Sequence, residues 1–405
     1  MKKNKSEKPN KFVSVLLFIV SKVYLFIFGY KVKYDRKVLD AHQDGFILIN
    51  NHYTMTDQFL IGASVKGRRI NYVVSSHYFN NKKTSWALKL IKAIKKEQFI
   101  SDITAIRKMK RVIDEQGIVY LAPAGQVTLM GANNFIPKAI VKLVRLCKGS
   151  VVAMQECGAH LCIPKWSKAK RRYPIDVKFV DVINKDEIKL LSDEEIYQRI
   201  VDAININEYL YQEQKMVPIK SKEICKGLEG ALFICPKCGK KLKNATDKNT
   251  IRCTSCGNLA IMDQYGFLKP ASKDDVCFKY PYEWYNYQKK VIKKEIENNS
   301  VYVNHDVILR LFNEEKRTMV DAGLGKLVLT NTEFYYEGTE YGKSIKKVFD
   351  LEHMVQTPFS PHSHIEIPDV EKFYQFVPAN DEVKVIVWAI VIEVLNDIRE
   401  GIANY

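Results

Sequence analysis

The sequence predicts a protein of the α/β class that carries smaller modules around a central domain. The expected parts are an N-terminal membrane-associated helix, an α/β domain, a four-Cys ribbon, and a small, mostly-β C-terminal domain closed by a helix. Three observations lead to this architecture. An apolar stretch opens the chain, strand-like and helix-like segments alternate over residues 31–205, and two Cys-x-x-Cys pairs lie within residues 235–256.

Length and charge limit the classes of function. The chain has 405 residues, enough for two or three domains. Its hydrophobic content of 46% excludes a disordered chain. The formal net charge of +17 indicates an anionic partner, and composition alone fits nucleic acid as well as an anionic membrane surface.

Residues 1–30 are predicted to form a basic N-terminus and a membrane-associated helix. Five lysines precede or open an apolar stretch of 19 residues that runs from Phe12 to Tyr30. No small-residue cleavage site follows, which argues against a signal peptide. Because the stretch is short for a span and Lys22 interrupts it, we expect a helix that lies in the cytoplasmic leaflet. A single span and a buried core helix are the alternatives.

Residues 31–213 are predicted to form an α/β domain with a largely central sheet. The expected strands are YKVKY (30–34), GFILIN (45–50), INYVVS (70–75), IVYLAP (118–123), SVVAMQ (150–155) and IDVKFVDVI (175–183). The expected helices between them cover residues 85–96, 103–116 and 135–149. Residues 192–214 are expected to form one further helix that Ser192 opens, because acidic residues fill its first turn.

The remaining chain divides into four parts. Residues 214–230 are predicted to be a linker, 231–268 the ribbon, and 269–300 a connecting helix with a basic face. Residues 301–405 begin with short strands and end with a segment that is apolar at helical spacing, which predicts a small β domain closed by one helix.

His52 and Asp57 are the candidate catalytic residues. They lie where the apolar strand ILIN gives way to a helix, in the stretch NNHYTMTDQF. Across such a turn, Asp57 can accept from one imidazole nitrogen and fix the tautomer, so that the other nitrogen takes a proton. A base of this kind, without a protein nucleophile, suits direct attack by a substrate hydroxyl on an activated acyl group. The alternative is a loop histidine beside an aspartate that caps a helix.

The same spacing occurs a second time, at His364 and Asp369. These residues belong to a strand-like stretch that contains Pro368, where side-chain alternation places them on opposite faces. We therefore interpret this second match as part of a surface strand.

The His52 motif and its surroundings resemble the phospholipid/glycerol acyltransferase family, of the lysophosphatidate acyltransferase type. That family carries Asn-His-x4-Asp shortly after an N-terminal membrane helix and a strand, and here Asn51, His52 and Asp57 stand at the expected distance. The resemblance covers roughly residues 12–180. It implies an α/β acyltransferase domain in which a histidine base acts on the acceptor hydroxyl.

The family's later blocks are present in position but altered. The stretch APAGQVT, residues 122–128, keeps Pro123 and Gly125 of the family block. It has Ala124 and Val127 where the family has a glutamate and an arginine.

Two further blocks differ from the family pattern. Residues 99–102, Phe-Ile-Ser-Asp, place Asp102 where a family arginine would bind phosphate, and residues 152–154, Val-Ala-Met, lack the family's proline. Each missing charge-assisted contact to phosphate is worth roughly 1.5–3 kcal/mol. The resemblance therefore implies acyl transfer to an acceptor other than free lysophosphatidate, such as a lipid with a masked phosphate, a sugar, or another lipid-linked hydroxyl.

The candidate substrate-binding residues are Asn51, Pro123, Gly125, Gln126, Thr128 and Lys138. We expect Gly125 and its flanking backbone amides to approach the substrate or the thioester oxygen. Lys138 is a candidate anion contact, with a solvated helix face as the alternative.

Two cysteine pairs indicate a zinc ribbon. Each pair supplies two thiolates from a tight turn, and a glycine follows each pair. Four thiolates suit tetrahedral Zn²⁺, and a four-Cys site is closed, so the metal is expected to be structural. A dithiol redox site and a disulfide pair are the alternatives. The four predicted ligands are Cys235, Cys238, Cys253 and Cys256.

The C-terminal part, residues 301–405, resembles a pleckstrin-homology or GRAM-type domain, through the stretch GKLVLTNTEFYYEG and the final helix. A β domain with a purely structural role is the alternative. Basic residues gather in the first domain, where residues 82–111 hold ten lysines and arginines against two acids. Beside an apolar N-terminal helix, this surface suits an anionic membrane, the phosphates of coenzyme A, or an acidic carrier protein, with a solvated surface as the alternative.

These observations together predict a membrane-peripheral O-acyltransferase. The expected donor is acyl-CoA or an acylated carrier protein, and the acceptor is a lipid hydroxyl of the lysophospholipid or glycerolipid type. The expected location is the cytoplasmic face of the cell membrane, peripheral or monotopic, and nucleic acid is not expected as a partner. The alternatives are a catalytically dead, lipid-binding member of the same fold and a basic zinc-ribbon protein that binds nucleic acid.

Overall fold

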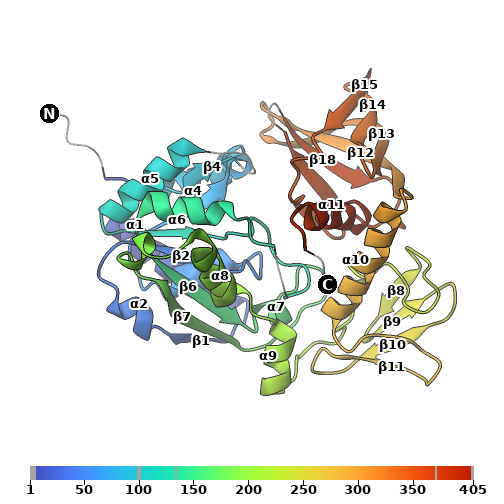
Figure 1. Cartoon of the computed structure of the whole chain (residues 1–405), viewed down its shortest axis with the longest axis horizontal. Helices are drawn as coiled ribbons and strands as arrows, with labels where there is room; N and C mark the ends of the chain where they lie inside the picture. Colours follow the sequence, from blue (N-terminus) through green and yellow to red (C-terminus); the bar gives the residue numbers. More distant parts are fainter. Residues whose placement is uncertain (1–5, 98–101, 133–134, 370–371, 403–405) are drawn as a thin grey trace. The chain divides into compact units, whose positions relative to one another are not determined.

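The computed structural model describes residues 6–97, 102–132, 135–369 and 372–402. The chain forms two compact units (Figure 1). Unit 1 comprises Met1–Pro164 and Arg171–Ile219. Unit 2 comprises Lys165–Lys170 and Lys220–Tyr405.

Unit 1 is built around a seven-stranded sheet with the strand order β1-β7-β6-β2-β5-β3-β4. Neighbouring strands are parallel, except for the antiparallel pair β6 and β7. The strands are β1 (Val32–Asp35), β2 (Phe46–Ile49), β3 (Ile70–Ser75), β4 (Ile94–Lys96), β5 (Ile118–Leu121), β6 (Ser150–Cys157) and β7 (Ile175–Ile183). Helices connect the parallel strands, so the predicted mixed α/β class is confirmed.

The described helices of unit 1 lie between and after these strands. The α-helices are α1 (Lys11–Ile27), α2 (Lys37–Ala41), α3 (Asp57–Ser64), α4 (Lys82–Leu90), α5 (Ile103–Asp114), α6 (Ala139–Cys147), α7 (Ala159–Cys162), α8 (Asp193–Ile204) and α9 (Glu208–Lys215). Two 3₁₀-helices, η1 (Ser76–Phe79) and η2 (Glu187–Lys189), complete the set.

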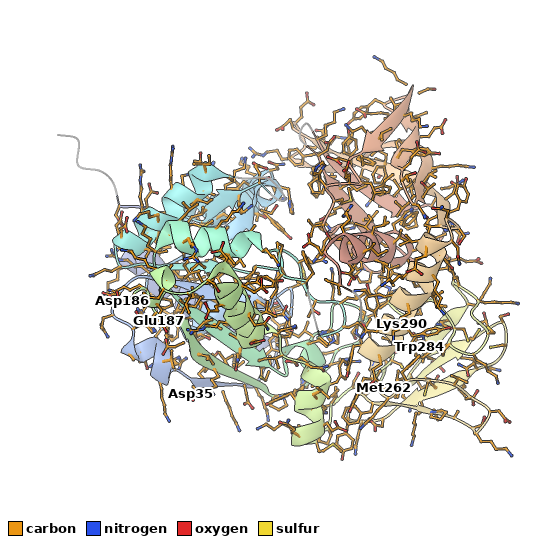
Figure 2. All side chains as sticks on the ribbon, viewed as in Figure 1. Asp35, Asp186, Glu187, Met262, Trp284 and Lys290 are labelled. Atoms are coloured by element: carbon orange, nitrogen blue, oxygen red, sulfur yellow. The ribbon has the colours of Figure 1, made fainter. Side chains whose placement is uncertain are left out.

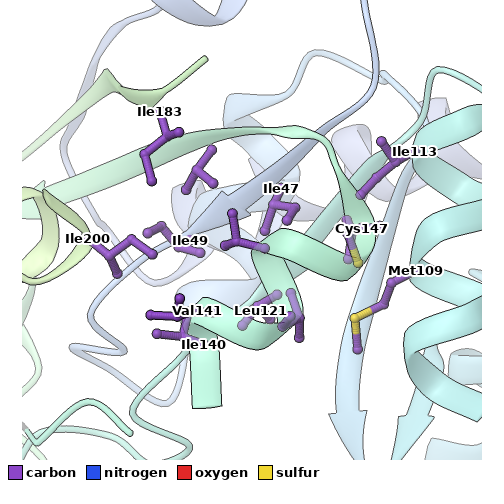
Figure 3. Packing of buried hydrophobic residues seen from close by; sticks show 14 of the residues in the cluster. Ile47, Ile49, Met109, Ile113, Leu121, Ile140, Val141, Cys147, Ile183 and Ile200 are labelled. Carbon is purple, nitrogen blue, oxygen red and sulfur yellow. The ribbon is translucent and has the colours of Figure 1, made fainter. Parts of the chain in front are cut away.

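One face of the unit 1 sheet is covered by α5, α6 and α8. Ile47 and Ile49 of β2 pack there against Val141 of α6 and Ile200 of α8 in a single apolar cluster (Figure 3). Alternate residues of a strand point to opposite faces, so Phe46 and Leu48 of β2 face the other side.

Helix α1 packs closely on α3. The rings of Tyr24 and Phe59 stack with their centroids 3.8 Å apart. A Cβ atom at Gly62 would lie only 2.3 Å from Oγ of Ser21, so a larger residue there would force the Ser21 side chain to move. Among the described residues, no helix has the length and apolar character needed to cross a bilayer.

Three helix predictions in unit 1 are wrong in extent. The helix expected over residues 135–149 begins only at Ala139. Residues 85–96 do not form one helix, because Lys92 adopts a left-handed φ of 50° and Ile94 starts strand β4. The single helix expected over residues 192–214 is two, α8 and α9. Asn207 causes the break, since its side chain accepts the backbone N–H groups of Tyr209 and Leu210 and so caps a new helix.

The ribbon of unit 2 is a four-stranded antiparallel sheet with the order β11-β10-β9-β8. Its elements are η3 (Leu228–Gly230), β8 (Asn244–Asp247), β9 (Thr250–Cys253), β10 (Leu259–Met262) and β11 (Leu268–Pro270), followed by helix α10 (Pro281–Glu297). Gln288 of α10 accepts the backbone N–H groups of Phe233 and Ile234, and Trp284 donates to the Ile234 carbonyl. Figure 2 shows buried Trp284 and exposed Lys290 on this helix.

The C-terminal part of unit 2 is an antiparallel seven-stranded sheet with one closing helix, α11 (Ile386–Arg399). The strands are β12 (Tyr302–Asn313), β13 (Thr318–Thr330), β14 (Phe334–Glu340), β15 (Lys343–Phe349), β16 (Phe359–Ser360), β17 (His364–Pro368) and β18 (Phe373–Pro378). Trp388 of α11 is buried against the sheet and donates Nε1–H to the Leu327 carbonyl at 3.2 Å. The resemblance to a pleckstrin-homology or GRAM-type domain stays a prediction.

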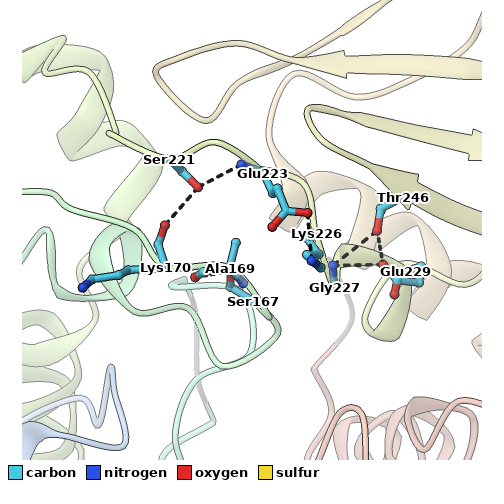
Figure 4. Close-up of polar contacts among 9 residues, drawn as sticks. All are labelled: Ser167, Ala169, Lys170, Ser221, Glu223, Lys226, Gly227, Glu229 and Thr246. Carbon is cyan, nitrogen blue, oxygen red and sulfur yellow. Dashed lines mark hydrogen bonds and ion pairs between the residues drawn. The ribbon is translucent and has the colours of Figure 1, made fainter.

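The short segment Lys165–Lys170 belongs to unit 2 although it interrupts unit 1 in the sequence. Ser221 donates its hydroxyl to the Lys170 carbonyl at 3.1 Å, within a group of polar contacts that also ties Gly227 to Thr246 (Figure 4). The Trp166 carbonyl would lie 2.4 Å from a Cβ atom at Gly227, where φ is +96°. Only glycine fits at this close approach.

Candidate active site and metal centre

The candidate active site lies at the carboxyl end of β2. In the parallel part of the sheet, β2 lies between β5 and β6. Loops that follow central parallel strands converge at one edge of a sheet, where ligands bind in open α/β folds. His52 lies in the loop after β2, and Asp57 is the first residue of the next helix, α3.

His52 and Asp57 form a hydrogen-bonded pair. Nδ1 of His52 lies 2.9 Å from Oδ2 of Asp57. The Asp57 side chain is 1% exposed and that of His52 is 26% exposed. Since Asp57 is the acceptor at Nδ1, the tautomer protonated at Nδ1 is favoured, and Nε2 has no protein partner within the described chain.

Burial distinguishes this pair from two others among the described residues. His42 pairs with Asp181 and His353 pairs with Asp350, but those carboxylates are 64% and 68% exposed. A buried carboxylate is less screened by solvent and is held more rigidly than an exposed one. The His52 pair therefore has the geometry of a base and its orienting group.

Three further donors hold the Asp57 carboxylate in place. The Thr54 backbone N–H and hydroxyl both donate to Oδ1, at 2.9 and 2.6 Å. The Asn50 amide donates to Oδ2 at 3.2 Å, and the Tyr120 hydroxyl in turn donates to Oδ1 of Asn50 at 2.8 Å. This network fixes the carboxylate facing His52.

The loop after β5 carries most of the predicted substrate-binding residues and is bonded to the His52 loop. The Thr128 backbone N–H donates to the His52 carbonyl at 2.9 Å, and Oγ1 of Thr128 accepts the Gly131 N–H at 3.0 Å. Gly125 is exposed at φ +72°, with open space around its Cβ position. Pro123 and Gln126 flank it and are half-buried.

The other two predicted substrate-binding residues lie in different settings. Asn51 is buried, and its side chain faces the Tyr53 hydroxyl. Lys138 is exposed, and its Nζ lies 3.4 Å from Oε2 of Glu194 and 5.6 Å from the Tyr197 ring centroid. Both of these contacts of Lys138 are to α8.

The altered family blocks offer few polar groups. Ala124 and Val127, at the positions of the family's glutamate and arginine, are buried. Asp102 caps α5 by accepting the Ala105 N–H at 2.8 Å, while residues 99–101 of that block lie outside the described residues. Residues 152–154 are buried in strand β6.

The second His-x4-Asp match does not form a pair. His364 lies 3.1 Å from Oε1 of Glu366, and Asp369 lies 2.5 Å from Nζ of Lys347. The two residues of this match thus have different partners.

Two buried acids near the site were missed in the sequence. Glu156 on β6 faces Asp57, and burial, with Asp57 nearby, raises the pKa of Glu156 well above its usual range. Glu208, at the start of α9, is also fully buried, and burial raises its pKa to about 8. A glutamate inside the apolar stretch SVVAMQEC is the one signal that points to Glu156.

The four predicted metal-ligating cysteines come together in the ribbon. Their sulfur atoms all lie within 4.8 Å of one another. Sγ of Cys235 is 3.7 Å from that of Cys256, and Sγ of Cys238 is 3.8 Å from that of Cys253. Four sulfurs at 2.3 Å from a tetrahedral ion would be about 3.8 Å apart, so these side chains fit a single metal ion.

The backbone around the cysteines also suits ligation. Gly239 and Gly257 have positive φ, and their N–H groups donate to the carbonyls of Cys235 and Cys253, which closes each Cys-x-x-Cys turn. The backbone N–H of Lys240 lowers the pKa of the Cys238 thiol to about 7. This lowered pKa favours the metal-binding thiolate at Cys238, whereas burial raises the pKa of Cys235 to about 12.

Comparisons with known proteins find similarity among solved structures. No protein-family model matches the chain, and no curated protein matches its sequence. The chain is similar to the 1-acyl-sn-glycerophosphate (LPA) acyltransferase PlsC from Thermotoga maritima, with a TM-score of 0.42 and 15% identity, over 51% of this chain and 81% of that one. This likeness assigns neither a substrate nor catalytic residues to the present chain.

Proposed function

We propose that the protein is a membrane-peripheral O-acyltransferase that moves a fatty acyl group from a thioester to a hydroxyl of a lipid. The observation that carries this proposal is the buried Asp57 carboxylate paired with the partly exposed His52 ring. An imidazole that is held by Asp57 and whose Nε2 has no protein partner within the described chain supports direct attack by a substrate hydroxyl.

The reaction needs one proton carrier. Nε2 of His52 takes the acceptor's hydroxyl proton while the oxygen attacks the thioester carbonyl carbon. Asp57 stabilises the imidazolium that forms. The N–H of Gly125 itself donates to the Ala122 carbonyl at 3.0 Å, so the backbone N–H groups that flank it are proposed to donate to the oxyanion of the tetrahedral intermediate. When the intermediate collapses, the carbon–sulfur bond breaks, and the imidazolium returns the proton to the leaving thiolate.

The acceptor is proposed to lack a free phosphate monoester. Ala124 and Val127 are buried and apolar, so the loop after β5 offers no arginine fork at these positions. A phosphate monoester binds best to such a fork. This favours a lysophospholipid with an esterified phosphate, a glycolipid, or another lipid-linked hydroxyl as the acceptor.

The surface of α1 supports a membrane location at the cytoplasmic leaflet. Ser14, Ser21 and Leu25 are buried toward the rest of unit 1, whereas eight apolar side chains elsewhere on the helix are exposed. The exposed apolar residues are Phe12, Val15, Leu16, Ile19, Val20, Val23, Phe26 and Ile27. A helix that buries serines and exposes phenylalanine and valine matches an apolar surrounding on its outer side.

The metal in the ribbon is proposed to be zinc in a structural role. Four cysteine ligands close the coordination shell, which leaves no position for a substrate. The role of the metal is then to hold residues 231–262 in their fold.

Thioester turnover tests the catalytic proposal. The donors are acyl-CoA and acylated carrier protein, and the acceptors in liposomes are lysophosphatidate, a lysophospholipid with an esterified phosphate, and a glycolipid. The His52→Ala variant should lose about 10²–10⁴-fold in rate. The matched control is His42→Ala, which breaks the exposed His42–Asp181 pair and should keep the wild-type rate.

Equal rates for wild type and His52→Ala would reject the mechanism. Sedimentation with anionic liposomes tests the membrane proposal, and the double variant Ile19→Glu/Val23→Glu should bind more weakly than Leu190→Glu, which changes an exposed leucine outside α1. Salt-sensitive binding to nucleic acid in place of liposomes would favour the basic zinc-ribbon alternative.

A further inference from the structure

Glu156 is a fully buried carboxyl group that faces Asp57, the orienting residue of the candidate site. It lies on β6, the strand next to β2, and is 0% exposed. Its side chain faces the Asp57 carboxylate and the Asn50 amide. The mechanism described above assigns it no role.

An ionised Glu156 carboxylate would need hydrogen-bond donors, but the Asp57 carboxylate that it faces is an acceptor. Within the described chain, neither of its carboxyl oxygens accepts a hydrogen bond from an N–H or O–H group. The Asn50 amide, its polar neighbour, acts to lower the pKa of Glu156, but its hydrogen bond at 3.2 Å goes to Oδ2 of Asp57. Two carboxyl groups that face each other are both satisfied only when one of them carries a proton.

The titratable groups around Glu156 also favour its protonated form. Asp57 faces it from α3 and Glu208 from α9, and both acids act to keep it protonated. The phenols Tyr34 of β1 and Tyr120 of β5, and the thiol of its neighbour Cys157, also interact with it. None of these groups is a cation, so an ionised Glu156 would be an uncompensated buried charge.

We propose that Glu156 is a neutral, proton-holding positioning residue that donates its carboxyl O–H to Asp57. This donation leaves Asp57 as the single negative charge beside His52 and adds one more donor to those that fix its orientation. Burial and the adjacent Asp57 raise the pKa of Glu156, which agrees with this state. The consequence for catalysis rests on the proposed function, whereas the protonation of Glu156 does not.

Two substitutions separate the charge of Glu156 from its hydrogen bond. Glu156→Gln keeps the shape and a donor and can never carry a charge. Glu156→Leu removes the donor and leaves Asp57 with less of its charge neutralised. The readout is the pH midpoint of the His52 imidazole titration by NMR, with the His52 signal assigned from its absence in His52→Gln.

The expected result is a midpoint within about half a unit of wild type in Glu156→Gln and an upward shift of about one unit in Glu156→Leu. A fall of about one unit in Glu156→Gln would show that wild-type Glu156 is charged and would overturn the proposal. A rise of the His52 midpoint in Glu156→Gln that is as large as in Glu156→Leu would also overturn the proposal. An unchanged midpoint in Glu156→Leu would do the same. If Glu156→Leu does not fold, the isosteric glutamine variant still decides the charge.

Turnover measured in parallel separates the two proposals. Glu156→Gln should keep kcat within about threefold, and Glu156→Leu should lose about tenfold in kcat with KM unchanged, the rate equivalent of one hydrogen bond to a charged group. If wild type shows no acyl transfer, the proposed function fails, but the His52 titration still tests the protonation of Glu156.

Discussion

The backbone N–H of Gly158 lies 2.9 and 2.8 Å from the two carboxyl oxygens of Glu208. Gly158 follows β6 directly, and Glu208 opens α9, so this contact joins the end of a sheet strand to a helix some 50 residues later. The backbone N–H groups of His160 and Leu161 also face the same carboxyl group. Burial nevertheless dominates and raises the pKa of Glu208 to about 8.

The raised pKa of Glu208 predicts a loss of stability as the pH rises. Between about pH 4.3, where the unfolded glutamate ionises, and about pH 8, the folded chain holds a proton that the unfolded chain releases. The free energy of unfolding should therefore fall across this window, by up to about 1.4 kcal/mol per pH unit from this group.

Urea unfolding at pH 5, 6.5 and 8 measures this effect. The Glu208→Gln variant should show a shallower fall than wild type, since its amide does not titrate. Glu194→Gln, which changes an exposed glutamate on α8, should follow wild type. Identical pH slopes for wild type and Glu208→Gln would contradict the prediction.

Asp57→Asn is predicted to lower turnover while leaving the fold intact. Oδ1 still accepts both donors of Thr54, but the charge that stabilises the His52 imidazolium is lost. The expected loss is about 10²–10⁴-fold in kcat, with a smaller effect on KM. The control is Asp181→Asn, which neutralises the exposed partner of His42 and should leave kcat unchanged. A fully active Asp57→Asn would remove Asp57 from the mechanism.

Local sequence signals predicted much of the fold. The apolar run IDVKFVDVI became strand β7, and Ser192 opens α8 with the side-chain and backbone bonds of a capping box. The boundary errors came from single residues whose conformation competes with helix continuation. Lys92 turns left-handed before β4, and Asn207 caps α9 inside what reads as one periodic segment.

The candidate site was predictable only where its members are near in sequence. The five-residue spacing indicated that His52 and Asp57 would approach, and the structure brings them together. Tyr120, Glu156 and Glu208 reach the same region from other strands and helices. Their approach depends on the order of β2, β5 and β6 in the sheet, which no local pattern specifies.

Metal removal is predicted to unfold the ribbon. Metal analysis of the purified protein should find about one zinc ion per chain, since the four sulfurs form one cluster. Cys235→Ser should lose the metal and expose residues 231–262 to proteolysis, because metal binding supplies the folding free energy of such small modules. Cys277 lies outside the cluster, so the Cys277→Ser variant should retain the metal. A metal-free wild type with a protected ribbon would exclude a structural metal.

Lys289 is predicted to be a main electrostatic link between α10 and α11. Its Nζ lies 2.9 Å from Oε1 of Glu393 and 2.5 Å from Oδ2 of Asp397, and the lysine side chain is buried. Although burial opposes the charge, the two carboxylates raise the pKa of Lys289 above its usual value. Lys289→Ala would leave buried Asp397 without its cation, which should lower the free energy of unfolding by about 3–5 kcal/mol.

Chemical denaturation measures this loss. The control is Lys290→Ala, on the exposed side of the same helix, which should change the free energy of unfolding by less than about 0.5 kcal/mol. Equal stabilities of the two variants would contradict this role of Lys289.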